Sequence, residues 1–211
     1  MSEHLLSQQA YEMIKHQIIT IQIKPGSLIS ENELAEQLNM SRTPIRKATA
    51  RLESEGFIET IKNRGMYVKL FTEQDMRHMT ETILSFLFYS ILLHRKTNVE
   101  YNYEKLKAIL DLQMKAEEND NYLDYIHAHL QFQRAIISIT QNEVFLQVFD
   151  QLTDKIVLTT YNRYLNTPYL KHYSANQFNK RLLEALMKQD IEEAQTLILK
   201  MGSLYQMNVK I

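Results

Sequence analysis

The amino-acid sequence predicts a mainly α-helical protein with two domains, one at residues 1–71 and the other at residues 72–211. In the first part, helical spacing of apolar residues gives way to strand-like alternation, whereas the second part shows long stretches of 3.6-residue periodicity. The second part also has only one glycine, Gly202, and one proline, Pro168, so little interrupts its helices. The expected fold is an N-terminal winged helix-turn-helix followed by an all-α antiparallel helical bundle.

Two helical segments meet across a turn of about four residues near Met40, which is the pattern of a helix-turn-helix. Apolar residues form one stripe on each helix, and these are Leu34, Ala35 and Leu38, then Ile45, Ala48, Thr49 and Leu52. The second helix is expected at residues 41–55. Ser41 is a suitable N-cap, Pro44 falls in the first turn, and Gly56 follows the end of the helix.

The N-terminal half of this second helix is basic. Residues 42–51 include Arg42, Arg46, Lys47 and Arg51, and the first carboxylate is that of Glu53. Such a helix is suited to entering the groove of a polyanion. Taken alone, a basic surface helix is more often just a solvated face. The neighbouring turn and hairpin shift the interpretation toward DNA binding.

Beyond the second helix, the sequence takes the period of a β-strand. Residues 57–61 and 66–70 alternate around a polar turn whose glycine supplies the backbone freedom that a hairpin needs. We expect this hairpin to be a wing. Arg64 and Gly65 at its tip would lie beside the second helix, where an arginine can reach a phosphate or the minor groove.

Residues 8–70 resemble the winged helix-turn-helix of the GntR family of bacterial transcription regulators. The matching residues are Pro25-Gly26, Leu28, Ser30-Glu31, Glu33-Leu34-Ala35, Leu38, Ser41 to Arg46, Ala48, Leu52, Gly56-Phe57-Ile58 and Arg64 to Val68. The resemblance implies that Arg42, Arg46 and Gly65 contact DNA. Two departures are Asn32, where a further DNA-contacting arginine is frequent, and Lys47, where glutamate is usual. Asn32 would weaken or change the recognition of bases, and Lys47 would add positive charge near the DNA backbone. The expected DNA-contacting residues are Asn32, Arg42, Thr43, Arg46, Lys47, Arg64 and Gly65.

Six helices are expected in the second domain, each bounded by a cap or a helix breaker. They lie at residues 73–97, 101–118, 121–140, 143–166, 172–188 and 190–208. A bundle of this kind can enclose a small-molecule cavity between its helices.

This bundle resembles the all-helical FCD-type effector domain of the fatty-acid-metabolism regulator subgroup. The likeness rests on helix lengths and on Asn142, Phe145-Leu146, Leu182 to Leu186, Asp190 and Ala194. Many members bind a divalent metal through one Asp and three His, whose positions here hold His129, Gln133, Asn179 and Met201. A frequent Arg–Glu pair aligns with Ile83 and Leu87. Because amide and thioether groups with one imidazole are poor ligands for such metals, we expect neither a metal nor another cofactor.

The residues that replace the metal ligands favour an apolar effector. Aromatic and methionine side chains, which adapt to irregular apolar ligands, are frequent in this domain. Core packing, however, explains such residues more often than ligand binding does. They are Phe86, Phe88, Tyr89, Phe132, Tyr161, Tyr164 and Met201. Gln133 and Asn179 would pair with each other or with His129, or else bind a ligand. Arg163 is either a carboxylate anchor or an exposed charge. The expected effector pocket consists of Ile83, Leu87, His129, Gln133, Arg163, Asn179 and Met201.

The composition is that of an ordinary globular protein, with 45% hydrophobic and 23% charged residues and no cysteine. No signal segment precedes Leu5, and the longest apolar run, residues 83–93, is too short to span a bilayer. A cytoplasmic protein without a membrane partner is expected. The net charge of -1 argues against indiscriminate nucleic-acid binding, so affinity must come from a local patch doubled by dimerisation.

The leading functional hypothesis is a homodimeric repressor on a palindromic double-stranded operator, released by a small, largely apolar effector. The alternative is a DNA-binding dimer whose helical domain is only a dimerisation scaffold. An enzyme is not expected, because the sequence has no nucleophile–base pair, phosphate loop or carboxylate dyad at usable spacing. The operator sequence, the effector and the direction of regulation stay open.

Overall fold

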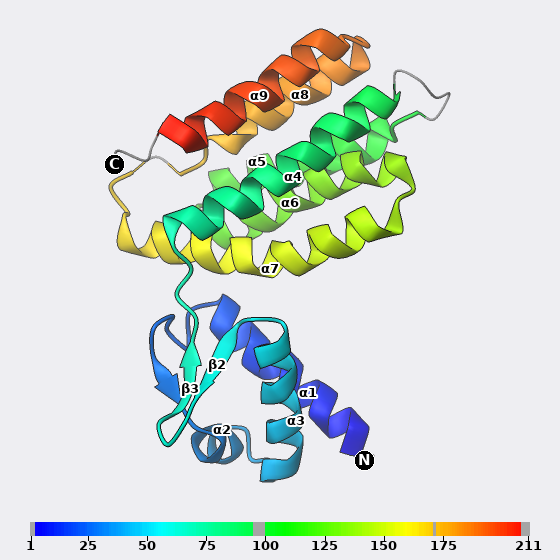
Figure 1. The fold of residues 1–211 in the computed structure, drawn as a ribbon. Coiled ribbons are helices and arrows are strands. Elements are labelled where there is room, and N and C mark those ends of the chain that lie inside the picture. The colour runs from blue at the N-terminus through cyan, green and yellow to red at the C-terminus, as the bar shows by residue number, and fades with distance from the viewer. Residues whose placement is uncertain (1–2, 95–99, 171, 208–211) are drawn as a thin grey trace. The chain divides into compact units, whose positions relative to one another are not determined.

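The computed structural model describes residues 3–94, 100–170 and 172–207. Within this part, the chain divides between Phe71 and Thr72 into two compact units, which are described separately. The first contains three α-helices and a three-stranded sheet, and the second contains six α-helices and one short 3-10 helix (Figure 1). The mainly α-helical fold class expected from the sequence is confirmed.

The first unit is built around one helix that packs against two others. Helix α3 (Arg42–Ser54) packs along α1 (Glu3–Ile19) and against α2 (Glu31–Gln37). The sheet is antiparallel with the order β1-β3-β2, from strands β1 (Leu28–Ile29), β2 (Ile58–Ile61) and β3 (Gly65–Val68). Fully buried apolar side chains from these elements form one core, and they include Ala10, Ile14, Ile18, Leu34, Ile45, Leu52, Phe57 and Val68. Neither α1 nor β1 was among the elements expected from the sequence.

Capping fixes where α2 begins more firmly than where α3 begins. The Ser30 hydroxyl accepts a hydrogen bond from the Glu33 backbone N–H at 3.2 Å, and the Glu33 carboxylate accepts one from the Ser30 N–H at 2.8 Å. This reciprocal pair is a capping box. Ser41 occupies the N-cap position of α3 as expected, but its side chain makes no capping hydrogen bond. Gly56, just beyond α3, has the positive φ of 81° that favours glycine.

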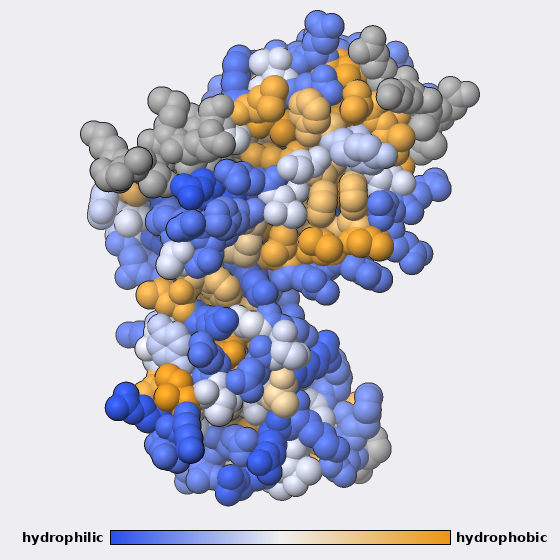
Figure 2. Space-filling model, viewed as in Figure 1, coloured by the Kyte–Doolittle hydropathy of each residue, from blue (hydrophilic) through white to orange (hydrophobic). Residues whose placement is uncertain are grey.

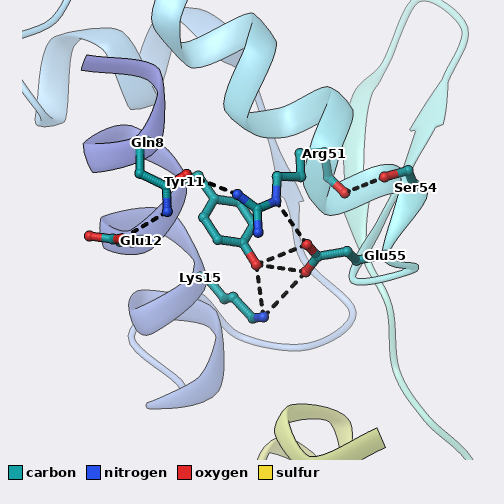
Figure 3. A network of polar contacts seen from close by, with 7 residues as sticks. All are labelled: Gln8, Tyr11, Glu12, Lys15, Arg51, Ser54 and Glu55. Carbon is teal, nitrogen blue, oxygen red and sulfur yellow. Dashed lines mark hydrogen bonds and ion pairs between the residues drawn. The ribbon is translucent and has the colours of Figure 1, made fainter. Parts of the chain in front are cut away.

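A polar network joins α1 to the C-terminal end of α3 (Figure 3). The Tyr11 hydroxyl lies 2.9 and 2.8 Å from the two carboxylate oxygens of Glu55, and Lys15 Nζ lies 3.2 Å from one of them. Arg51 Nε donates to the same carboxylate at 3.0 Å, while the guanidinium covers the Tyr11 ring at 3.7 Å. Arg51 also donates to the Gln8 side chain at 2.9 Å. Arg51 therefore packs against α1. The prediction that grouped it with residues facing a polyanion is wrong.

The second unit is a bundle in which α5 packs against α6 and α8, while α4 packs against α6, α7 and α9. The helices are α4 (Glu73–His94), α5 (Tyr103–Glu118), α6 (Tyr122–Ile137), α7 (Glu143–Asn166), α8 (Ala175–Met187) and α9 (Ile191–Met207). The 3-10 helix η1 (Ser138–Thr140) continues α6, so the helix expected at 121–140 is divided. Residues 95–97 and 208, expected to be helical, lie outside the described residues.

Helix α8 begins at Ala175 instead of residue 172, because the preceding side chains pack elsewhere. The rings of His172 and Tyr173 lie edge-on against Tyr122, at centroid distances of 5.4 and 5.3 Å. The Tyr173 hydroxyl also donates to Asp120 Oδ1 at 2.7 Å. These contacts hold His172 and Tyr173 away from a helical path.

No helix in residues 3–94, 100–170 and 172–207 combines the length and the hydrophobicity that crossing a bilayer requires.

Candidate functional site

A concave surface of about 450 Å³ lies in the first unit, between the starts of α2 and α3 and the hairpin of β2 and β3. Its lining residues are Ser30, Glu31, Asn32, Arg42, Arg46, Thr49, Ala50, Glu53, Thr60, Ile61, Lys62, Asn63, Gly65 and Met66. Four of the residues expected to contact DNA therefore share this concavity, and they are Asn32, Arg42, Arg46 and Gly65. Thr43, Lys47 and Arg64 are exposed but do not line it.

Glu31 forms ion pairs with both arginines of the concavity. One of its carboxylate oxygens lies 3.3 Å from Arg42 Nη2, and the other lies 3.9 Å from Arg46 Nε. The arginine side chains are 69% and 81% exposed, whereas that of Glu31 is only 26% exposed. The carboxylate thus lies beside two guanidinium groups that still face solvent. Sequence analysis missed this role, although an acidic residue in the first turn of α2 was visible in the sequence.

Lys47 faces a different neighbour. Its Nζ lies 2.6 Å from Glu3 Oε1 at the start of α1, and both side chains are more than half exposed. An exposed ion pair of this kind contributes little to stability and is readily exchanged for another partner. The positive charge expected near the DNA backbone is therefore partly balanced by α1.

The wing glycine is required by packing within the domain. Gly65 has a φ of 99°, and a Cβ atom at this position would lie 2.6 Å from the carbonyl oxygen of Ile29 in β1. Any other residue would push β3 away from β1. The close packing of β3 on β1 therefore explains why glycine occupies this position, without any contact with a ligand.

A buried polar cluster lies in the interior of the second unit. The His129 ring, on α6, has Asn179 Nδ2 of α8 3.0 Å from its Nδ1 and Gln133 Nε2 of α6 3.0 Å from its Nε2. Asn179 Nδ2 also donates to Gln113 Oε1 of α5 at 2.7 Å. Gln133 and Asn179 therefore pair with His129, one of the alternatives left open by the sequence. Gln113 was missed, because nothing in its local sequence indicates that this glutamine is fully buried.

The other expected pocket residues occupy different environments. Ile83 and Leu87 on α4 are buried, and Met201 on α9 is half-buried. Arg163 lies at the surface, where Nη1 is 3.7 Å from Glu73 Oε2 and about half of the side chain is exposed. Of the two alternatives for Arg163, this environment matches that of an exposed charge.

Burial lowers the pKa of His129 to about 4, against a smaller opposing effect of the hydrogen bond with Asn179, so the ring is neutral near pH 7. A neutral imidazole accepts at one nitrogen and donates at the other, so one of the two flanking amides turns its oxygen to the ring. Both ring nitrogens are thereby engaged. Gln113 Nε2 and Asn179 Oδ1 are buried without a hydrogen-bond partner among the described residues.

Two family models match this chain. The model of the bacterial regulatory proteins of the gntR family matches residues 6–68, and the FCD domain model matches residues 98–201. The chain belongs to the GntR family. The resemblance expected from the sequence is confirmed for both domains, and the matched family models and relatives are regulatory proteins, not enzymes.

Individual relatives agree with this assignment. The Nta operon transcriptional regulator of Aminobacter aminovorans is 27% identical over 143 residues, which are 65% of each chain. The transcriptional repressor RspR of Escherichia coli K12 is 33% identical over 73 residues, 35% of this chain and 32% of the relative. The matches thus span less than two thirds of these relatives. A GntR transcriptional regulator from Rhodococcus sp. RHA1 shares the fold, with a TM-score of 0.79, 15% identity and coverage of 97% and 99% of the two chains.

The polar cluster of this GntR protein does not fit a divalent metal. Both nitrogens of His129 are engaged with amides, and amide groups with one imidazole are weak ligands for transition metals. Among residues 3–94, 100–170 and 172–207, no three His, Cys, Asp or Glu side chains are grouped closely enough to hold a metal ion.

We predict that the purified protein contains no stoichiometric zinc, nickel or manganese by elemental analysis. A chelator should leave its melting temperature unchanged, because hydrogen bonds and not a metal join α5, α6 and α8. His127→Ala, on the same helix, serves as the control for His129→Ala. One bound metal per chain that is lost in His129→Ala but kept in His127→Ala would overturn this interpretation.

Proposed function

We propose that this GntR protein is a homodimeric transcriptional repressor that binds a palindromic operator in double-stranded DNA. In this proposal, residues 1–71 bind DNA, and residues 72–211 bind an effector and dimerise. The supporting observation is the concavity that brings Arg42, Arg46 and Asn32 beside the wing. Arginine forms paired hydrogen bonds with guanine in the major groove, and solvent-facing guanidinium groups are available for them. The operator lies in the bacterial cytoplasm, which is therefore the proposed location.

Arg46→Ala should weaken operator binding by about 1 to 3 kcal/mol per half-site while binding to unrelated DNA changes less. The reason is that the removed group would contact a base edge, whereas phosphate contacts carry no sequence information. A titration against operator and scrambled duplexes at fixed salt measures the difference, and circular dichroism checks the fold.

Lys47→Ala is the matched control on the next residue of α3. Because Lys47 lies beside Glu3 and outside the concavity, its loss should weaken both duplexes alike and reduce the salt dependence. Equal operator affinity of Arg46→Ala and the unmodified chain would remove the support for this DNA face.

An apolar surface on the second unit supports the homodimer. Helix α4 has no charged residue between Thr82 and Leu93, and an uncharged surface rich in aromatic side chains is typical of one that a partner covers. Its Phe86 ring stacks on Phe145 of α7 with 4.3 Å between centroids, and Tyr89 beside it is 46% exposed. Figure 2 shows hydrophobic residues gathered between α4 and α7. A second copy can cover this face with the same face of its own, giving the two-fold symmetry that a palindrome requires.

Tyr89→Arg should convert the dimer to a monomer in sedimentation experiments, because the guanidinium would be buried without a partner in the interface. Leu112→Arg is the control, since Leu112 is 57% exposed on α5, outside the surface of α4 and α7. A dimer that persists in Tyr89→Arg, or a monomeric unmodified chain, would contradict this assignment of the interface.

The buried cluster supports an effector that is mainly apolar. Ile83 and Leu87 offer hydrocarbon, while Gln113 Nε2 and Asn179 Oδ1 offer one donor and one acceptor. With no ionised group in the cluster, a multiply charged anion would leave water without compensation. The alternative is that the second domain only dimerises, which the mutual pairing of His129, Gln133 and Asn179 favours.

We predict that octanoate or benzoate raises the melting temperature of the full chain, whereas citrate does not, because only the first two bury apolar area with one carboxylate. Gln133→Leu and Asn179→Leu should reduce this rise without changing operator affinity in the absence of ligand. Two variants are needed because Asn179→Leu leaves Gln113 unpaired and can lower stability by about 1 to 3 kcal/mol. A response to citrate alone would reverse the proposed ligand class, and no response to any of these acids would favour the scaffold.

A further inference from the structure

Asn32 offers an unused amide on the concave surface. It is the second residue of α2, its side chain is exposed, and it lines the concavity together with Arg42 and Arg46. Within the part of the chain that the structure describes, its amide has no hydrogen-bond partner. Its two preceding neighbours are engaged, since Ser30 caps α2 and Glu31 contacts the arginines. The free polar group at the start of α2 is therefore that of Asn32.

The surroundings of Asn32 disfavour a phosphate contact. The first turn of α2 carries the carboxylates of Glu31 and Glu33, whose negative charge offsets the positive end of the helix dipole that would otherwise attract an anion. A neutral base edge needs no such attraction. The Asn32 amide is therefore suited to a base instead of the sugar–phosphate backbone.

The chemistry of a primary amide selects one base. Its oxygen accepts and its nitrogen donates, and adenine presents the complementary pair, N6–H₂ and N7, in the major groove. Guanine presents two acceptors there, so an amide can satisfy only one of them. We propose that Asn32 selects an adenine in each operator half-site, next to bases contacted by Arg42 and Arg46. This inference rests on the proposed DNA-binding function.

The start of α2 is rigid enough for a short side chain to discriminate. The capping box holds Ser30 and Glu33 together through hydrogen bonds of 3.2 and 2.8 Å. The Glu31 contact of 3.3 Å to Arg42 joins this helix end to α3. Because the asparagine side chain has only two torsions, its reach is set largely by this backbone. The asparagine side chain can therefore contact only one base pair, whereas the longer arginine side chains can reach several positions.

The test is selection of duplexes from a random library by the full-length unmodified chain, Asn32→Ala, Asn32→Arg and Gln37→Ala. The unmodified chain should enrich an adenine at one symmetry-related position per half-site. Asn32→Ala should lose that preference by roughly 5- to 100-fold at that position and keep the others. Asn32→Arg should replace the adenine with guanine there. Gln37, exposed on α2 outside the concavity, is the control that should leave the consensus unchanged.

The outcomes separate this inference from the function on which it rests. If the unmodified chain enriches a two-fold symmetric consensus that Asn32→Ala leaves unaltered, the adenine assignment is wrong and DNA binding stands. A uniform weakening by Asn32→Ala across all sequences would also overturn it, because that is the behaviour of a phosphate contact. If the unmodified chain enriches no sequence, the proposed function itself fails.

Discussion

The attachment of α3 to α1 is the constraint on which the concave surface of the first unit depends, and one carboxylate lies at the centre of this attachment. Burial alone would raise the pKa of Glu55, but its hydrogen bond from Tyr11 and the charge of Lys15 outweigh this and lower it. The group therefore stays ionised at neutral pH, and its contribution to stability is present above the ordinary glutamate pKa. That contribution is lost as the pH falls through the lowered value. Within this range Arg51 is held against α1.

The four cationic side chains of α3 contact two different neighbours. Arg51 and Lys47 reach toward α1, whereas Arg42 and Arg46 lie beside Glu31 on the concave side. A single helix can thus carry four cations and yet present only two of them beside the wing. This division explains how a chain of net charge -1 can display a local cationic surface without a generally basic domain.

The sequence predicted those parts of the structure that depend on local spacing. Helix α3, the hairpin and most helices of the bundle follow from periodicity, caps and glycine. The expectation that His129, Gln133 and Asn179 lie close together followed from a family resemblance. The roles of Glu31 and Arg51 could not be predicted in this way, because each depends on a partner brought close by tertiary packing. The same holds for Gln113, whose polar side chain gives no local signal that it is buried. The late start of α8 also depends on ring packing between distant segments.

In the proposed function, neutral hydrogen bonds at the positions of the family's metal ligands decide which effectors the helical domain can bind. A metal ion attracts anions over some distance, whereas an amide and a neutral imidazole act only at contact. Two buried atoms, Gln113 Nε2 and Asn179 Oδ1, lack partners among the described residues, so a purely hydrocarbon ligand would leave them unsatisfied. A molecule that supplies an acceptor and a donor to these two atoms, and is otherwise apolar, would satisfy both requirements. Recognition in such an interior depends on hydrogen-bond geometry more than on net charge.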